Sequence, residues 1–173
     1  MIGDGNYPTK RHRPPRLPNH DYTTPGYYFV TFNASQRGQN ILCAVNSPVA
    51  PAALGGQGVT LTSAGEIVQK LIGNIPSVYP DVRVDCYAIM PDHVHTIVVL
   101  GCQDGPPRAA GTTGTSLGRV VNAIKSLSSK QCGRPLWQRG YYDHVIRNGA
   151  DLDETRRYIR DNSARSFYST QGG

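Results

Sequence analysis

The chain has 173 residues, enough for one compact domain and too few for a long barrel or a doubly wound dinucleotide-binding enzyme. Hydrophobic residues make up 38% and charged residues 17% of the chain, with 19 glycines and 13 prolines, which is typical of a loop-rich globular protein and argues against a coiled coil or a disordered chain. The net charge of +6, with no acidic residue between Gly105 and Tyr142, makes a polyanion such as nucleic acid a natural partner, although a basic surface can also serve solubility alone.

The cellular setting follows from the cysteines and the apolar runs. The four cysteines form no Cys-x-x-Cys pair, and the first residues lack the apolar core of a signal peptide. The longest apolar stretches, such as 97–100, are far shorter than the ~20 residues that a membrane-spanning helix needs. We therefore expect a reduced cytoplasmic protein, associated with the nucleoid if it binds DNA, and no membrane role.

The first part of the chain predicts an arm followed by one strand. Residues 1–26 are rich in Pro, Asn, Arg and Gly without periodicity, which predicts an extended basic arm ahead of a single domain over residues 27–173. The aromatic and β-branched run 27–32 predicts a strand. Residues 33–60 mix Gly, Pro and Ala with short apolar pieces and predict a long loop with room for a hairpin.

Two helices and two strands are predicted in the middle of the chain. Ser63 to Glu66 has the Ser-x-x-Glu form of a capping box, and apolar residues at helical spacing follow it. Residues 82–90 and 93–100 predict two antiparallel strands joined by a tight connection, and 101–115 predicts a loop. The next helix has one apolar stripe formed by Leu117, Val120, Val121, Ile124 and Leu127, and Gly133 and Pro135 follow it.

The last two elements complete a recognisable order. Residues 141–147 predict a fourth strand, and 151–162 a helix with acids in its first turn and arginines later. The order strand, helix, strand, strand, helix, strand, helix predicts an α+β fold. We expect a ferredoxin-like sandwich: a four-stranded antiparallel sheet with two helices on one face and the C-terminal helix near the other.

Two histidines in the third predicted strand are the first candidates for chemistry. His93 and His95 are two residues apart, so a strand places both imidazoles on the same face, opposite the face that packs on the helices. Two adjacent imidazoles supply half of a metal site. Taken alone, however, His-Val-His is more readily explained as a half-exposed strand with two polar residues, because a metal site needs a third ligand.

The last predicted helix offers a third ligand and a nucleophile. Tyr158 and Asn162 are four residues apart and therefore lie one above the other on one helical face. A helix across the open sheet face would bring a phenol and an amide oxygen to the two imidazoles. Taken alone, Tyr158 is one of ten tyrosines and is more readily a packing or surface residue.

Several segments, in order along most of the chain, carry a resemblance to a known family. They are Arg16-Leu17-Pro18, Asp21-Tyr22, Pro25 to Thr31, Gly65 to Val68, Met90-Pro91-Asp92-His93-Val94-His95, Lys125-Ser126, Leu136 to Asn148, and Tyr158-Ile159-x-x-Asn162. Their order and spacing resemble the HUH single-tyrosine transposases, and within them the REP-associated tyrosine transposases. The chain departs from the family pattern after Asn162, where Ser163-Ala164-Arg165-Ser166 replaces Pro followed by a basic residue and often Trp.

The resemblance implies a nuclease that cuts and rejoins single-stranded DNA beside hairpins of repetitive extragenic palindromes. It implies a Mg²⁺ or Mn²⁺ ion held by His93, His95 and Asn162 to polarise the scissile phosphate. Tyr158 would attack the phosphorus, expel a 3′-hydroxyl and remain as a 5′-phosphotyrosine. Assistance to the phenol could come from any of three cations, among which the sequence does not choose: Arg157, Arg160 and Lys125.

A wider set of residues is expected to contact DNA. The basic and aromatic members are Lys10, Arg11, Arg13, Arg16, Arg119, Lys125, Trp137, Arg139, Tyr141, His144 and Arg157. For Trp137, Tyr141 and the neighbouring Tyr142, strand and core packing explain the aromatic ring at least as well as base stacking. For His144 we favour a structural or DNA-contacting role over metal ligation. The sequence is compatible with either a monomer or a homodimer.

Two other functions compete with a transposase. One is a DNA-hairpin-binding module without cleavage activity, which has no need of the complete set His93, His95, Tyr158 and Asn162. The other is a metal-dependent phosphoesterase for small substrates, which fits poorly with a basic arm and a helix free of acids.

Overall fold

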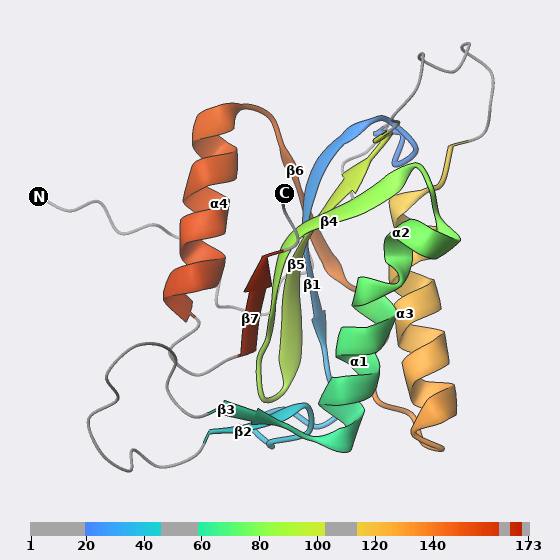
Figure 1. Ribbon diagram of the computed structural model, residues 1–173, viewed down its shortest axis with the longest axis vertical. Helices are drawn as coiled ribbons and strands as arrows, with labels where there is room; N and C mark the ends of the chain where they lie inside the picture. Colours follow the sequence, from blue (N-terminus) through green and yellow to red (C-terminus); the bar gives the residue numbers. More distant parts are fainter. Residues whose placement is uncertain (1–19, 46–58, 103–113, 163–166, 171–173) are drawn as a thin grey trace, which may run out of the picture.

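The computed structural model describes residues 20–45, 59–102, 114–162 and 167–170 (Figure 1). Its main sheet has five antiparallel strands in the order β6-β1-β5-β4-β7. Their bounds are β1 Gly26–Asn33, β4 Val82–Ile89, β5 His93–Leu100, β6 Tyr142–Ile146 and β7 Phe167–Thr170. The first four of these confirm the predicted strands and the ferredoxin-like α+β fold. The fifth, β7, is an edge strand beyond the prediction.

The helices form layers on both faces of this sheet (Figure 1). Their bounds are α1 Ser63–Gly73, α2 Ile75–Val78, α3 Leu117–Gln131 and α4 Gly149–Asp161. Helices α1 and α3 lie on one side and α4 on the other, as predicted, and the short α2, which was not predicted, lies on the side of α1 and α3. A small separate sheet pairs β2 (Cys43–Val45) with β3 (Val59–Leu61), in the region predicted as a loop with room for a hairpin. In the described part of the chain, no helix is long and apolar enough to cross a membrane.

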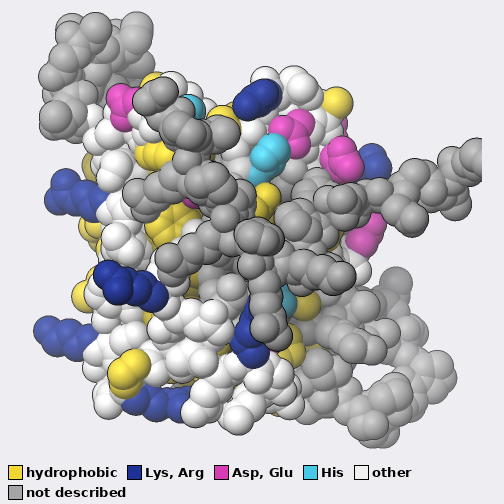
Figure 2. All heavy atoms as spheres, turned by 180° about the vertical axis from the view of Figure 1, so that it is seen from behind, with side chains coloured by type: hydrophobic (Ala, Val, Ile, Leu, Met, Phe, Trp, Pro, Cys, Tyr) yellow, Lys and Arg dark blue, Asp and Glu magenta, His cyan; other side chains and the backbone are white. Residues whose placement is uncertain are grey.

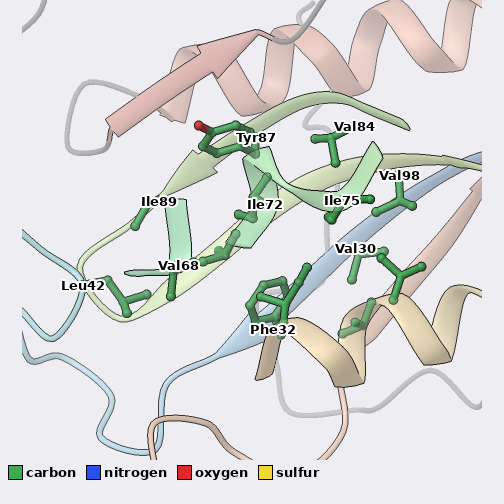
Figure 3. Close-up of a cluster of buried hydrophobic side chains, with 14 of the residues drawn as sticks. Val30, Phe32, Leu42, Val68, Ile72, Ile75, Val84, Tyr87, Ile89 and Val98 are labelled. Carbon is green, nitrogen blue, oxygen red and sulfur yellow. The ribbon is translucent and has the colours of Figure 1, made fainter. Parts of the chain in front are cut away.

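Each face of the sheet has its own hydrophobic cluster. The larger lies between the sheet and α1 and α3, and includes Val30, Phe32, Val68, Ile72 and Val98 (Figure 3). The smaller lies under α4 and consists of Phe29, Cys86, Ala88, Ile97, Ile146 and Ile159. Alternation along β1 and β5 sends successive side chains into the two clusters. The α4 face is therefore built on a sheet that is packed on both sides.

The capping box predicted at Ser63 is wrong by one residue. Thr62 is the N-cap, and its hydroxyl oxygen accepts a hydrogen bond from the Gly65 N–H at 3.2 Å. The same hydroxyl donates to the Ile41 carbonyl at 2.6 Å, and the Thr62 N–H donates to the Leu42 carbonyl at 2.9 Å. These contacts with the preceding segment fix the start of α1, and a local motif contains no information about them.

The predicted apolar stripe of α3 is correct for its first four residues and wrong at Leu127, which is 46% exposed. Ser128 takes the buried position instead. It follows Leu117 by eleven residues, which on a helix brings its side chain to within about 20° of the direction of Leu117, whereas Leu127, at ten residues, points about 80° away. The Ser128 hydroxyl donates to the Ile124 carbonyl at 2.6 Å and accepts from Trp137 Nε1 at 2.7 Å. A buried polar residue is thus satisfied within the core.

The predicted N-terminal arm, residues 1–26, is described only in its last seven residues, and the last of these, Gly26, already belongs to β1. Tyr22 packs against the larger cluster, its ring 4.9 Å from that of His20, and the Tyr22 carbonyl accepts from the Leu117 N–H. Residues 20–25 are therefore folded onto the domain. The four basic residues of the arm expected to contact DNA, Lys10, Arg11, Arg13 and Arg16, lie outside the described residues.

Candidate active site

The candidate site lies on the sheet face that α4 covers. Strand register places His95 of β5 opposite Thr31 of β1, and Thr31 in turn opposite Tyr142 of β6. Because directly paired residues point to the same face, these three side chains form a row across the sheet. Phe29 lies two residues before Thr31 in β1, on the same face and opposite Ile97. The strand alternation predicted for His93 and His95 holds in the structure.

His95 is the most buried polar group of this row, only 6% exposed. Its ring stacks on Phe29 with 5.4 Å between the centroids, and its Nδ1 lies 2.7 Å from Thr31 Oγ1. Burial, aided by the nearby His93, lowers the pKa of His95 to about 3. The imidazole is therefore neutral near pH 7, which is the form that binds a metal ion.

His93 faces His95 at the start of the same strand. Its Nε2 lies 3.1 Å from His95 Nε2, and its Nδ1 lies 2.7 Å from Asp92 Oδ1. Each ring thus has an oxygen at its δ nitrogen and the other ring at its ε nitrogen. The two imidazoles are about perpendicular, with an interplanar angle of 78°.

Tyr158 reaches the histidines from α4. Its ring centroid is 5.5 Å from that of His95 and 6.0 Å from that of Phe29. The side chain is half-buried, and this burial raises the pKa of the Tyr158 phenol above its ordinary value of 10.0. The hydroxyl is therefore protonated near pH 7.

Asn162 follows one turn after Tyr158, as the C-cap of α4. Its Nδ2 donates to the Tyr158 carbonyl at 2.8 Å, so the side-chain amide is fixed to the end of the helix that carries the phenol. The structure brings His93, His95 and Tyr158 together and places Asn162 on the same helical end. Among the described residues there is no group of three or more His, Cys, Asp or Glu side chains that could hold a metal ion.

An ion pair that the sequence did not predict anchors α4 to the sheet. Arg156 donates from Nε and Nη2 to the two carboxylate oxygens of Asp85 in β4, at 2.8 and 2.6 Å. Asp85 is the extra residue of a bulge in β4, where the register shifts between Val84 and Cys86. The bulge turns the Asp85 side chain toward α4. Its partner Arg156 precedes Tyr158 by two residues, so the ion pair holds the helix close to the phenol.

The first turn of α4 is held by a second set of polar contacts. Asn148 caps the helix by accepting from the Asp151 N–H at 2.9 Å. The Asp151 carboxylate accepts from the Arg147 N–H and lies 3.1 Å from His144 Nε2. His144 therefore links β6 to the start of the helix, and its ring is directed at a carboxylate.

Comparison with known proteins identifies the family. The family model described as "Transposase IS200 like" matches residues 63–162, which include both histidines, Tyr158 and Asn162. The chain belongs to the IS200-like transposase family. Membership of this family makes it a DNA-cleaving enzyme.

Two similar proteins cover most of the transposase. An uncharacterized protein of Haemophilus influenzae is 28% identical in an alignment 163 residues long, and the match covers 85% of this chain and 85% of the other. A solved structure of a REP-associated tyrosine transposase bound to a REP hairpin is similar in fold, with a TM-score of 0.58 at 21% identity. That likeness covers 83% of this chain and 69% of the other.

The residues expected to contact DNA are spread over both sides of the transposase. On α4, Arg157 is exposed, as is Arg160, whose guanidinium lies 3.8 Å from Asp161. Lys125 is on α3, across the sheet from Tyr158, and donates to the carbonyls of Gln138 and Gly140 at 2.8 and 2.5 Å. Of the three cations considered for assisting the phenol, only the two arginines share its helix.

The other expected DNA contacts of the described residues differ in their burial. Trp137 packs edge-on against Phe32, with 4.8 Å between centroids, and Tyr141 packs partly against the larger cluster. Arg139 is exposed, and Arg119 lies over the Tyr79 ring at 5.9 Å. Figure 2 shows the molecule from behind, with Lys and Arg side chains but no Asp or Glu at the lower left, which is the side of α1 and α3.

Proposed function

We propose that this transposase cleaves and rejoins single-stranded DNA beside a hairpin, through a covalent bond between Tyr158 and a 5′-phosphate. The observation that carries the proposal is the position of the Tyr158 ring, 5.5 Å from one of two histidines whose Nε2 atoms face each other at 3.1 Å. A nucleophile and two facing imidazole nitrogens thus share one surface.

The two histidines fit a divalent cation. Nitrogen ligands at about 2.1 Å from a metal ion and at right angles to each other are about 3.0 Å apart, close to the observed 3.1 Å. Asn162 would add its amide oxygen as a third ligand. Its amide nitrogen donates a hydrogen bond to the Tyr158 carbonyl, so the nitrogen and not the oxygen is turned toward the helix. When bound, Mg²⁺ or Mn²⁺ would polarise the scissile phosphate and stabilise the charge that develops on it.

Tyr158 supplies the covalent chemistry. Its hydroxyl oxygen forms a bond to phosphorus and loses its proton, while the bond from phosphorus to the 3′-oxygen breaks and that oxygen takes up a proton. Rejoining reverses the step: a 3′-hydroxyl attacks the phosphotyrosine and releases Tyr158. One phosphodiester replaces another, so no nucleotide cofactor is consumed. Burial raises the pKa of the phenol, so its proton has to leave in the course of the attack.

The DNA partner is inferred from the likeness to the REP-associated transposase, whose structure contains a REP hairpin. The sequence motifs resemble the same branch of the family. A basic surface on this chain supports a polyanionic partner, since α3 has Arg119, Lys125 and Lys130 and no acid.

A denaturing gel tests the proposal. Labelled single-stranded hairpin DNA from the flanks of the gene is incubated with wild type, Tyr158→Phe and Tyr142→Phe, with and without Mg²⁺ or Mn²⁺. We expect a covalent band for wild type with metal, none for Tyr158→Phe, and a retained band for Tyr142→Phe, a matched control on the same sheet face. Hairpin binding without an adduct on several flanking substrates would favour a binding module instead.

A further inference from the structure

The δ nitrogens of the two histidines are each held by a side-chain oxygen from a different part of the fold. Thr31 Oγ1 lies 2.7 Å from His95 Nδ1, and Asp92 Oδ1 lies 2.7 Å from His93 Nδ1. A histidine that binds a metal ion through Nε2 carries its proton on Nδ1. An oxygen at that position fixes the angle of the ring, and a carboxylate, which only accepts, also favours the tautomer with the proton on Nδ1.

Thr31 has particular importance because His95 is buried. With the residue 6% exposed and its ring packed against Phe29 and Tyr158, an Nδ1–H without an acceptor would be left inside the protein unsatisfied. A hydroxyl can also donate. Thr31 can therefore stay bonded to Nδ1 when His95 carries its proton on Nε2, and accept from Nδ1 when the proton is there.

Asp92 connects His93 to a second segment of the chain. Its other carboxylate oxygen, Oδ2, accepts from the Gly38 N–H at 2.8 Å, and its backbone carbonyl accepts from the Ala34 N–H at 2.7 Å. The segment 34–38 that follows β1 therefore holds Asp92 from two directions.

We propose that Thr31 and Asp92 are positioning residues of this transposase, which hold the two imidazoles with their Nε2 atoms facing a shared cation. Asp92 in addition couples the His93 ring to segment 34–38. The inference rests on the proposed function in one respect, namely that these histidines bind a divalent ion. It predicts that metal affinity is set by two side chains that never touch the metal.

Titration of Mn²⁺ into the full chain without DNA, followed by calorimetry, tests the inference. Thr31→Val removes the hydroxyl at nearly constant shape, Thr31→Ser keeps it, and Asp92→Ala removes the carboxylate. Glu154→Ala, an exposed acid on α4, is the control for the lost charge. We expect the Kd for Mn²⁺ to rise about 10- to 100-fold for Thr31→Val and Asp92→Ala, and to change less than about threefold for the other two.

Three results would contradict the account, and they are distinguishable. If wild type binds Mn²⁺ and the Thr31→Val and Asp92→Ala variants bind it as tightly, the positioning roles are wrong while the proposed function stands. If wild type binds no Mn²⁺, the proposed metal site is wrong. Should a variant fail to fold, the imidazole ¹⁵N spectrum of Zn²⁺-loaded wild type decides. Nδ1 protons whose ¹H shifts report a hydrogen bond to an oxygen support the inference. An Nδ1 proton without such a bond, or a proton on either Nε2, overturns it.

Discussion

The ion pair between Arg156 and Asp85 allows a quantitative prediction about the helix that carries the nucleophile. The pair has two charge-assisted hydrogen bonds, at 2.8 and 2.6 Å. Arg156 is 40% exposed and Asp85 only 16%, so solvent screens the pair in part. Exposed pairs contribute about 0.2–1 kcal/mol, and removing one partner of a fully buried pair costs about 3–5 kcal/mol. We therefore expect a coupling free energy of about 1–2 kcal/mol between these two residues.

A double-mutant cycle measures this coupling. Unfolding in urea is compared for wild type, Arg156→Ala, Asp85→Ala and the double variant. Arg156→Ala should cost about 2 kcal/mol and lower the Tm by about 4–8 °C, because it leaves a largely buried carboxylate without its guanidinium. Asp85→Ala should cost less, since Arg156 can turn toward solvent. The double variant should be about 1–2 kcal/mol more stable than the sum of the single changes predicts.

Hydrogen exchange locates the same effect. Loss of the ion pair should accelerate amide exchange in α4, whose buried side chains are few, while β5 stays protected. Single changes that add to within about 0.3–0.5 kcal/mol would refute the reasoning, and so would unchanged exchange in α4. In either case α4 would be held by its apolar contacts, chiefly those of Ile159, and the bulge at Asp85 would have no role in placing Tyr158.

Two further predictions concern the core. Leu127→Gln should change the free energy of unfolding in urea by less than about 0.5 kcal/mol, whereas Ile124→Ala should cost about 2–4 kcal/mol; a cost above about 1 kcal/mol at Leu127 would contradict the assigned α3 face. Burial and the charge of Asp85 raise the pKa of Cys86 to about 12, so its reactive thiolate stays scarce at pH 7–9. Maleimide should therefore label the half-buried Cys102 and Cys132 of the native protein, and react with the buried Cys86 and Cys43 only on unfolding. Labelling of native Cys86 at the rate of the half-buried thiols would disprove this.

The parts of the fold that follow from local patterns were predictable from the sequence. Five of the eight residues 93–100 are β-branched, which indicated the strand, and the two-residue spacing of His93 and His95 indicated their shared face. The α4 helix was evident from its charges, and its assignment to the open sheet face followed from the element order.

The parts that depend on contacts between distant segments were not predictable. The alternation of side chains along a strand does not reveal a bulge, so the one at Asp85 could not be predicted. Arg156, the partner of Asp85, is 71 residues away in the sequence. Thr31 is 64 residues from His95, and only the register of β1 against β5 brings them together. Strand β7 has four residues, too few for a pattern.

The attachment site of the DNA is the most direct test of the account. Tyr142 and Tyr158 both lie beside Phe29, with ring centroids 6.4 and 6.0 Å from it, so a covalent adduct alone does not identify the nucleophile. Wild type is reacted with hairpin DNA and Mn²⁺, digested with nuclease and protease, and analysed by mass spectrometry. We predict a 5′-nucleotide on the peptide that contains Tyr158. A nucleotide on Tyr142, or on any other residue, would contradict the central claim.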